Sequence, residues 1–291
     1  MRGLLILLMA VLPLAAPGSN PLETRFHNEA TDTARLNSLL VEGERTLGTG
    51  ADAGTRVAFF ARKFLGTPYV AHTLEAPDGE GEALTVNLDE LDCTTFAETA
   101  AALAVTLGEG RTSWRDFLYN LRRLRYRNGE VNGYASRLHY IADWGTDNIH
   151  KGTLSDATLL MPRNAWIVRS IDYMTRHREA YPALADSAQY ERMRKIEYGY
   201  RNHRFPYLRT GDLSDKKILG ALREGDILAF VSGMKDLDVT HMGILVREGG
   251  EWHVLHASQS AGKVVVSELP LKDFLKRNHQ WTGVRVFRVK S

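Results

Sequence analysis

The chain has 291 residues but only one cysteine, Cys93. A single cysteine cannot close an intrachain disulfide, and it excludes zinc sites built from cysteine pairs. The sequence also lacks the H-E-x-x-H pattern of helical zinc sites. The chemistry of this chain therefore has to be sought outside disulfide scaffolds and these common metal motifs.

The sequence also has no large excess of positive or negative charge. It contains 37 Lys and Arg residues and 35 Asp and Glu residues, which gives a net charge of +2. Such a balance gives no general electrostatic attraction to a polyanion, so we do not expect a nucleic-acid partner. The hydrophobic content of 44% is enough for a chain of this length to bury a large core.

Long apolar runs are missing except at the N-terminus. There, Met1-Arg2-Gly3 precede an apolar run from Leu4 to Leu14, and small residues follow. This layout predicts a secretory signal peptide over residues 1–18, too short to span a bilayer comfortably. We expect export to the periplasm or outside the cell, with no integral membrane segment after cleavage; an uncleaved anchor is the alternative. A lone thiol in an exported chain suggests chemistry, because exported proteins usually pair their cysteines.

The stretch with the strongest chemical pattern is Leu91-Asp92-Cys93-Thr94-Thr95-Phe96. Strong helix formers follow it as far as Gly108, and Asp92 is a good N-cap, so Cys93 is predicted in the first turn of a helix. The positive end of the helix dipole favours the nucleophilic thiolate there. The alternative is a buried, inert cysteine that packs as a small hydrophobic residue.

The order of the expected elements indicates an α+β fold. Helices are predicted around residues 35–41 and over 56–65. Residues 108–225 are basic and aromatic, with further helices expected near 113–125 and over 167–178, 186–195 and 214–222. After Gly225 the pattern changes to about five strands joined by short turns, predicted over 227–231, 240–247, 252–257, 263–267 and 281–289. Such an order predicts a mostly antiparallel sheet that packs on the helix of Cys93.

Two histidines lie on neighbouring predicted strands, His241 in one and His256 in the next. The turn at Glu248-Gly249-Gly250 makes these strands a hairpin, which brings the two imidazoles together. His253 faces the opposite side of the strand and is a weaker candidate. A metal site would need a third ligand, which the sequence does not offer, so no metal is expected. Two unrelated structural histidines are the other alternative.

A polar and aromatic cluster occupies residues 134–143, with Arg137, His139, Tyr140 and Asp143 as its most functional side chains. Such a cluster is typical of a binding groove. It is equally typical of a buried polar network, because buried polar groups need partners in either case.

Five stretches resemble, in their order along the chain, the NlpC-type, papain-like cysteine amidases and peptidases that cut bacterial peptidoglycan: Leu65-Gly66-Thr67-Pro68-Tyr69, Asp92-Cys93, Gly225-Asp226-Ile227, His241-Met242-Gly243-Ile244 and Leu255-His256-Ala257-Ser258. The common nucleophile motif of that family is Asp-Cys-Ser-Gly, whereas this chain has Asp92-Cys93-Thr94-Thr95. With Phe96 and residues 136–140, the chain is similar to a branch described as N-acetylmuramoyl-L-alanine amidase-like. The resemblance covers roughly residues 55–290.

The resemblance implies roles for particular residues. Cys93 is then the nucleophile, His241 the general base and His256 the residue that orients it. Tyr69 corresponds to a family tyrosine beside the nucleophile that positions substrate or stabilises the oxyanion. Asp92 corresponds to an aspartate that binds a free amino terminus in the peptidases, and the change to Thr94-Thr95 puts that specificity in doubt. Arg137, His139, Tyr140 and Asp143 become candidate groove residues.

The implied fold is papain-like, with a signal peptide over 1–18, an N-terminal helical extension over 19–54, and one catalytic domain over 55–291 that carries a helical insertion over 108–225. The implied activity is cofactor-free hydrolysis of an amide bond in peptidoglycan or muropeptides, most simply the N-acetylmuramoyl-L-alanine bond. The alternatives are an endopeptidase that cuts between D-glutamate and the diamino acid of the stem peptide, and a non-catalytic wall-binding module. The sequence does not indicate an oligomeric state.

Overall fold

A computed structural model of the chain describes residues 24–48, 50–77 and 80–290. The predicted signal peptide lies outside the described residues. The helices are α1 (Glu29–Leu47), α2 (Ala53–Arg62), α3 (Cys93–Gly108), α4 (Trp114–Arg125), α5 (Ile141–His150), α6 (Tyr173–Arg176), α7 (Ser187–Gly199), α8 (Lys216–Ala221) and α9 (Leu271–Arg277). The strands are β1 (Thr24–Phe26), β2 (Leu84–Val86), β3 (Leu154–Asp156), β4 (Ala165–Arg169), β5 (His203–Arg209), β6 (Ile227–Ser232), β7 (Val239–Glu248), β8 (Glu251–Ser258), β9 (Lys263–Val266) and β10 (Trp281–Val289).

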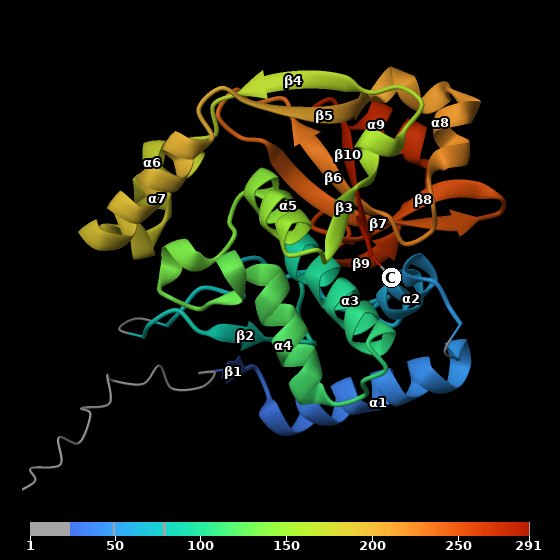
Figure 1. The fold of residues 1–291 in the computed structure, drawn as a ribbon, viewed down its shortest axis with the longest axis horizontal. Coiled ribbons are helices and arrows are strands. Elements are labelled where there is room, and N and C mark those ends of the chain that lie inside the picture. Colours follow the sequence, from blue (N-terminus) through green and yellow to red (C-terminus); the bar gives the residue numbers. More distant parts are fainter. Residues whose placement is uncertain (1–23, 49, 78–79, 291) are drawn as a thin grey trace, which may run out of the picture.

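An antiparallel sheet of eight strands lies over the helices α1–α4 in the view of Figure 1. Its order is β4-β5-β10-β6-β7-β8-β9, and β3 also pairs with β10. The five strands predicted after Gly225 are all present. The mixed α and β composition with a largely antiparallel sheet is thus confirmed.

Segment 108–225 departs from the expectation of a purely helical insertion, because it contributes β3, β4 and β5 to the sheet. The helix predicted over residues 167–178 is wrong. Ala165–Arg169 is instead a strand whose residues alternate between the two faces and pair with β5, and only Tyr173–Arg176 is helical. Helices α4, α7 and α8 lie close to the predicted ranges.

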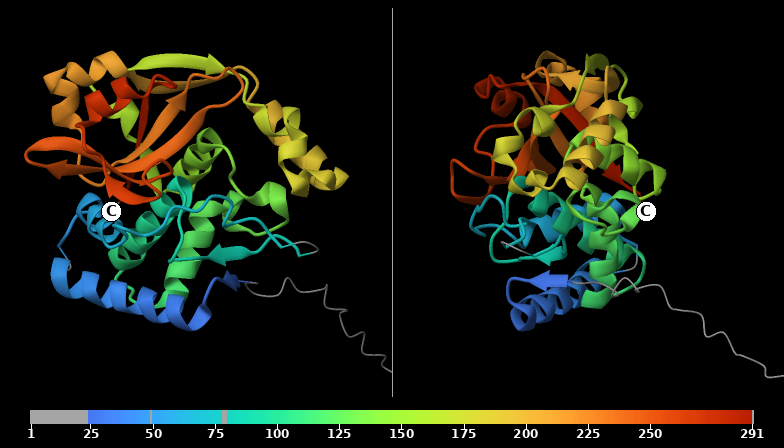
Figure 2. Two further views of the ribbon diagram at one scale, coloured as in Figure 1. Left: turned by 180° about the vertical axis from the view of Figure 1, so that it is seen from behind. Right: turned by 90° about the vertical axis from the view of Figure 1, so that its left-hand side faces the viewer.

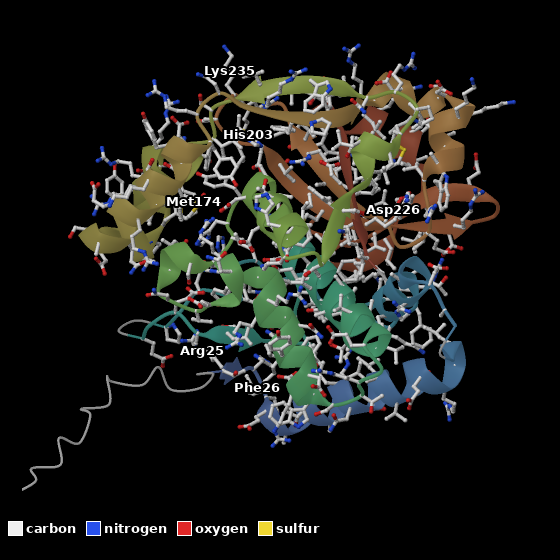
Figure 3. The ribbon with its side chains drawn as sticks, viewed as in Figure 1. Arg25, Phe26, Met174, His203, Asp226 and Lys235 are labelled. Carbon is white, nitrogen blue, oxygen red and sulfur yellow. The ribbon has the colours of Figure 1, made fainter. Side chains whose placement is uncertain are left out.

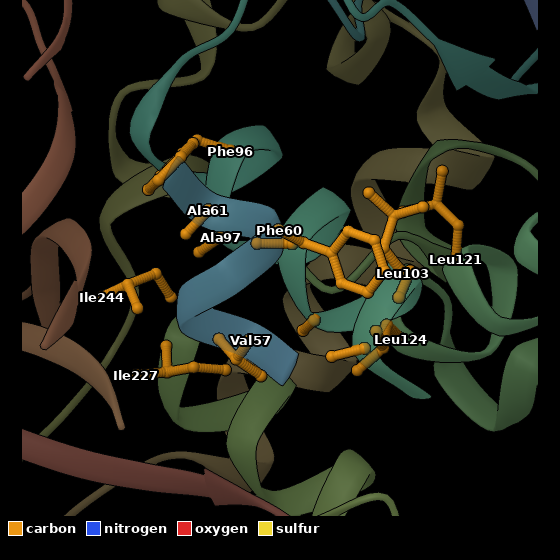
Figure 4. Packing of buried hydrophobic residues seen from close by; sticks show 14 of the residues in the cluster. Val57, Phe60, Ala61, Phe96, Ala97, Leu103, Leu121, Leu124, Ile227 and Ile244 are labelled. Atoms are coloured by element: carbon orange, nitrogen blue, oxygen red, sulfur yellow. The ribbon is translucent and has the colours of Figure 1, made fainter. Parts of the chain in front are cut away.

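The main core lies between the sheet and the helix that begins at Cys93. Helix α3 is rich in alanine, a strong helix former whose small side chain lets the helix approach its neighbours closely. Figure 4 shows Phe96 and Ala97 of α3 packed with Val57 and Ala61 of α2, near Ile244 of the sheet. This packing fixes the start of α3 against β7.

Two smaller clusters complete the interior. On the other face of the sheet, α8 and α9 cover a cluster that includes Leu228, Phe230 and Leu245. A third cluster joins Tyr140, Met174 and other residues of segment 108–225. Figure 2 shows the pair α6 and α7, which belong to this third cluster, projecting at one side of the sheet.

The N-terminal residues rest against the segment that leads to Cys93. Strand β1 pairs in parallel with β2, and its Arg25 and Phe26 are marked in Figure 3. Asn28 caps α1 by accepting a hydrogen bond from the Thr31 amide. Farther along α1, Arg35 donates to the Leu88 carbonyl at 2.9 Å. Helix α1 therefore holds the segment that leads from β2 to α3.

Among the described residues, no helix combines the length and the apolar character that a membrane span requires.

Candidate functional site

The first turn of α3 is built around Asp92. Its Oδ1 accepts hydrogen bonds from the amides of Thr94 (2.9 Å) and Thr95 (2.7 Å). The Thr95 hydroxyl in return accepts a bond from the Asp92 amide at 2.9 Å, which completes a capping box. Asp92 is thus the N-cap, as predicted, and Cys93 is the first residue of the helix.

Cys93 as a whole residue is half-buried, and the surroundings of its thiol do not favour the thiolate. Burial raises the pKa of Cys93 to about 12, and the negative charge of Asp92 adds to the rise. The backbone N–H of Met242 and the Thr94 hydroxyl act against the rise without cancelling it. The expectation of a thiolate at the helix start is therefore wrong for the resting protein, because burial has the largest influence on the pKa of Cys93.

His241 and His256 meet on the hairpin of β7 and β8, as the strand pairing predicts. Ile244 pairs with Leu255, and Nε2 of His241 lies 2.8 Å from Nδ1 of His256. Burial lowers the pKa of His241 to about 3, helped by the nearby His256, and burial also lowers the pKa of His256 to about 4. Both rings are neutral at neutral pH, so one must donate to the other.

Gly243 permits this meeting of the two strands. A Cβ at this position would lie 2.5 Å from Cγ1 of Val254 and 3.2 Å from Cβ of His256. The first distance is shorter than a van der Waals contact allows, so any larger residue would push β8 and His256 away from His241.

Tyr69 and Cys93 pack against the same core cluster. The amide of Tyr69 donates to the Gly262 carbonyl at 2.9 Å, and an isolated bridge joins Tyr69 to Leu91. Burial raises the pKa of Tyr69, and the negative charges of Cys93 and Asp92 raise it further. The hydroxyl therefore stays protonated and can donate a hydrogen bond near the thiol.

The four groove candidates from the sequence are engaged in internal contacts. All are in segment 108–225, and each bonds a partner distant in sequence or holds a local turn: Arg137 with Glu75 (3.0 Å) and Glu82 (3.2 Å), His139 with the Tyr134 carbonyl (2.9 Å), Tyr140 with Glu197 (2.7 Å), and Asp143 with Arg127 and with the Tyr200 hydroxyl (2.8 Å). Arg137 thus joins the segment to the rest of the chain, and the other three contacts hold the segment together internally. A role of the four residues in binding stays a prediction.

Sequence reasoning missed the aromatic side chains around the two histidines. Trp281 stacks on His241, Phe230 also contacts His241, and Phe274 meets His256 edge-on. They come from β10, β6 and α9. In the sequence these three residues are recognisable only as aromatic residues within or beside predicted strands. Such residues are common in any protein core, so they do not point to a site.

The described residues hold no group of three or more His, Cys, Asp or Glu side chains arranged to bind a metal ion.

Comparison with known proteins adds an independent line of evidence. The model of the AmiA-like family, described as N-acetylmuramoyl-L-alanine amidase-like, matches residues 59–284. The chain belongs to this family. The matched range contains Cys93, both histidines, Tyr69 and the whole of segment 108–225.

Solved structures support the same assignment. The chain is similar to an N-acetylmuramoyl-L-alanine amidase from Bacteroides uniformis, with 40% identity and a TM-score of 0.77 over 82% of this chain and 99% of the other. A structure from Bacteroides fragilis, whose name proposes a xylanase, has 39% identity and a TM-score of 0.73 over 79% and 99%. A Legionella pneumophila protein shares the fold at 20% identity and a TM-score of 0.67, over 91% and 97%. No curated protein matches the chain.

Proposed function

We propose that this member of the AmiA-like family is a cysteine-dependent N-acetylmuramoyl-L-alanine amidase that acts on peptidoglycan or muropeptides. The observation that carries the proposal is the 2.8 Å contact between Nε2 of His241 on β7 and Nδ1 of His256 on β8, next to the core cluster in which Met242, the residue after His241, packs with Cys93. A thiol, a base and an orienting group are the parts that acyl transfer through a cysteine needs. Membership of an amidase-like family supports the choice of an amide bond.

The proton positions follow from the neutral state of both rings. Nε2 of His241 is engaged with His256, which leaves Nδ1 of His241 for the thiol. To accept a proton at Nδ1, His241 carries its own hydrogen on Nε2 and donates it to Nδ1 of His256. His256 thereby fixes the tautomer and the ring orientation of the base.

Catalysis then proceeds by two acyl transfers. The Cys93 thiol gives its proton to Nδ1 of His241 as the sulfur attacks the lactyl carbonyl carbon, and a tetrahedral oxyanion forms. His241 returns the proton to the alanine nitrogen, the C–N bond breaks, and the stem peptide leaves. Water then loses a proton to His241 and attacks the thioester, which releases the muramoyl carboxylate and restores the thiol.

The oxyanion requires donors that are not already used. The amides of Thr94 and Thr95 are taken by Asp92, so the amide of Cys93 itself and the hydroxyl of Tyr69 are the proposed donors. Because the pKa of Tyr69 is raised, its proton remains available throughout turnover.

The hydrogen bonds of Asp92 do not distinguish the amidase from the endopeptidase, so the choice rests on the family. In the peptidases that the sequence resembles, the corresponding carboxylate binds the amino terminus of the stem peptide. Here Oδ1 of Asp92 accepts three hydrogen bonds, from the two amides and from the Thr95 hydroxyl at 3.0 Å. Among the described residues Oδ2 of Asp92 has no hydrogen-bond partner, so a free amine could bind there while Oδ1 keeps the cap of α3.

Two other readings are weaker. A non-catalytic wall-binding module needs neither the single thiol nor two histidines held within hydrogen-bond distance of each other. A glycoside hydrolase uses two carboxylic acids, whereas Asp92, the acidic side chain next to Cys93, is occupied by the cap.

The remaining proposals concern architecture and location. We propose a papain-like, NlpC-type arrangement in which residues 55–291 form the catalytic domain, residues 108–225 are its insertion, and residues 19–54 extend it. Export through the signal peptide over residues 1–18 would take the enzyme to the compartment that contains peptidoglycan, with Arg137, His139, Tyr140 and Asp143 along the groove. No cofactor takes part in the proposed reaction.

Mass spectrometry of purified muropeptides tests the proposal, with the wild type, Cys93→Ala and His253→Gln incubated in parallel. We expect free stem peptide, with a new amino terminus on L-alanine, from the wild type and from the His253 variant but not from Cys93→Ala. Cleavage between D-glutamate and the diamino acid would instead establish the endopeptidase. No product from any folded variant would contradict both.

A further inference from the structure

The histidine pair lies inside a box of three aromatic rings, Phe230, Phe274 and Trp281. Phe230 is the direct strand partner of His241, so both side chains emerge on the same face of the sheet. Their ring centroids are 5.5 Å apart. Phe274 of α9 closes the box over His256, with 5.2 Å between the ring centroids. The box therefore encloses both imidazoles.

Trp281 differs from the other two rings in how it meets the proposed base. Its ring is nearly parallel to that of His241, at an interplanar angle of 11° and a centroid distance of 5.5 Å, which is offset stacking. The other contacts of the box are tilted or edge-on. A parallel ring limits the tilt of the imidazole plane, so Trp281 restrains the direction of Nδ1 and Nε2 together with the hydrogen bond to His256.

The indole is itself fixed to the strand that carries His241. Its Nε1 donates a hydrogen bond to Oγ1 of Thr240 at 3.0 Å, and Thr240 immediately precedes His241. Phe230 packs on the indole with 4.6 Å between centroids, and a register shift between β6 and β10 begins at Trp281. A bulged strand end commonly redirects a side chain, as this one directs Trp281 onto the imidazole.

We propose that Trp281 is a positioning residue for the reaction: it holds the ring plane of His241 and shields the His241–His256 hydrogen bond from water. The inference rests on the proposed function, because it assumes that His241 moves the thiol proton. Thr240 contributes to this positioning because it accepts the hydrogen bond of the indole.

The test combines three variants with two readouts. Trp281→Leu removes the stacked ring, Trp281→Phe keeps a ring but loses the hydrogen bond, and Thr240→Val removes the acceptor alone. Trp166→Leu is the matched control, because Trp166 is a tryptophan at the sheet edge that is 47% exposed. The readouts are kcat and KM on muropeptides, and the pKa of His241 from NMR titration with labelled histidine. His256 is the titratable group that contacts His241, so His256→Gln serves to assign the signals.

For Trp281→Leu we expect kcat to fall about tenfold with KM within about twofold, because a misaligned base affects the transition state more than binding. The pKa of His241 should rise by about one unit as water reaches the ring. Trp281→Phe should recover most of kcat, Thr240→Val should lose about threefold, and Trp166→Leu should match the wild type.

A folded Trp281→Leu protein with the wild-type pKa of His241 would overturn the proposal, whether or not kcat falls, since a loss of kcat alone would indicate a structural role. If Trp281→Leu does not fold, Thr240→Val decides in the same way. The NMR readout needs no substrate. If no variant or wild type acts on muropeptides, the proposed function fails, while the pKa values still decide the role of Trp281.

Discussion

The reactive site and segment 108–225 use ionisable groups in opposite ways. Around Cys93, His241 and His256, burial moves every pKa toward the neutral form, so the site carries no charge on these groups at rest. Segment 108–225 is joined to the rest of the chain by buried ion pairs. Arg125 meets Glu98 of α3 at 2.6 Å, and Arg137 meets Glu82 at 3.2 Å.

This difference suits the proposed site to proton transfer and the ion pairs to holding segment 108–225 in place. A resting site without charge develops charge only as the thiol proton moves, and the low dielectric around it then strengthens each favourable contact. Buried ion pairs add little net stability, yet they are costly to break, so they suit a segment that must stay in one orientation. Basic residues outnumber acidic ones in segment 108–225, and the reverse holds in the rest of the chain.

Loss of the proposed base should give the largest effect. We expect His241→Gln to lower kcat about 1000-fold, because general acid–base groups contribute factors of this order. His253→Gln is the control: its ring bonds the Ser267 carbonyl at 2.8 Å and takes no part in the proposed proton path. Steady-state kinetics on muropeptides should show the control near the wild-type rate. Equal losses in both variants would remove the distinction between the two hairpin histidines.

The raised pKa of Cys93 predicts a slow thiol. Alkylation by iodoacetamide should accelerate about tenfold for each pH unit between pH 6 and pH 9, without a plateau, because only the thiolate reacts. The chain has one cysteine, so a single mass increment reports the reaction. The reagent's reaction with a cysteine peptide provides the reference rate. A plateau below pH 7 would indicate a resting thiolate–imidazolium pair and would erase the contrast with segment 108–225.

On the other side of the comparison, Asp143→Ala should lower the free energy of unfolding by about 3 kcal/mol, because it leaves Arg127 and the Tyr200 hydroxyl without their shared partner. Urea denaturation measures this change. The exposed ion pair between Glu191 and Arg194 is the control. Glu191→Ala should lower the free energy of unfolding by less than about 0.5 kcal/mol. If Asp143→Ala keeps full stability but raises KM, Asp143 is a groove residue instead of an anchor.

Acid should destabilise the site through its histidines. The unfolded chain protonates His241 and His256 near pH 6.5, whereas the folded chain resists protonation down to about pH 3 and 4. Stability is therefore lost as the pH falls below 6.5, by up to about 1.4 kcal/mol per pH unit for each histidine. Unfolding curves of wild type and His241→Gln between pH 7 and 4.5 should show a smaller slope for the variant. Identical slopes would mean that His241 is not buried in its neutral form.

Local patterns predicted much of this site. The turn Glu248-Gly249-Gly250 between two alternating runs was enough to pair the strands of His241 and His256, and Asp92 before an alanine-rich run was enough to start α3. Both features depend on residues a few positions apart. The family resemblance added roles that spacing alone could not assign.

The missed features depend on distant partners. Strand β3 pairs Asp156 with Phe287, and the short β4 is a strand only because β5 lies beside it. The polar cluster at residues 134–143 was ambiguous because the partners of its side chains, such as Glu197, are far along the sequence. The prediction that the pKa of Cys93 is lowered was wrong for a similar reason. The helix start is visible in the sequence, but the atoms that bury the thiol and raise its pKa are not.

Gly243 sets a limit on how far related chains can be judged by their reactive residues. With 2.5 Å between a Cβ at this position and Cγ1 of Val254, a larger residue here requires the Val254 side chain or β8 to shift. A homologous gene that encodes the cysteine and both histidines but a larger residue here would look complete in a motif search. In its product the cysteine and the two histidines would be present but displaced from one another. Genome surveys that count amidases of this family should therefore check for glycine at this position as well as for the cysteine and the histidines.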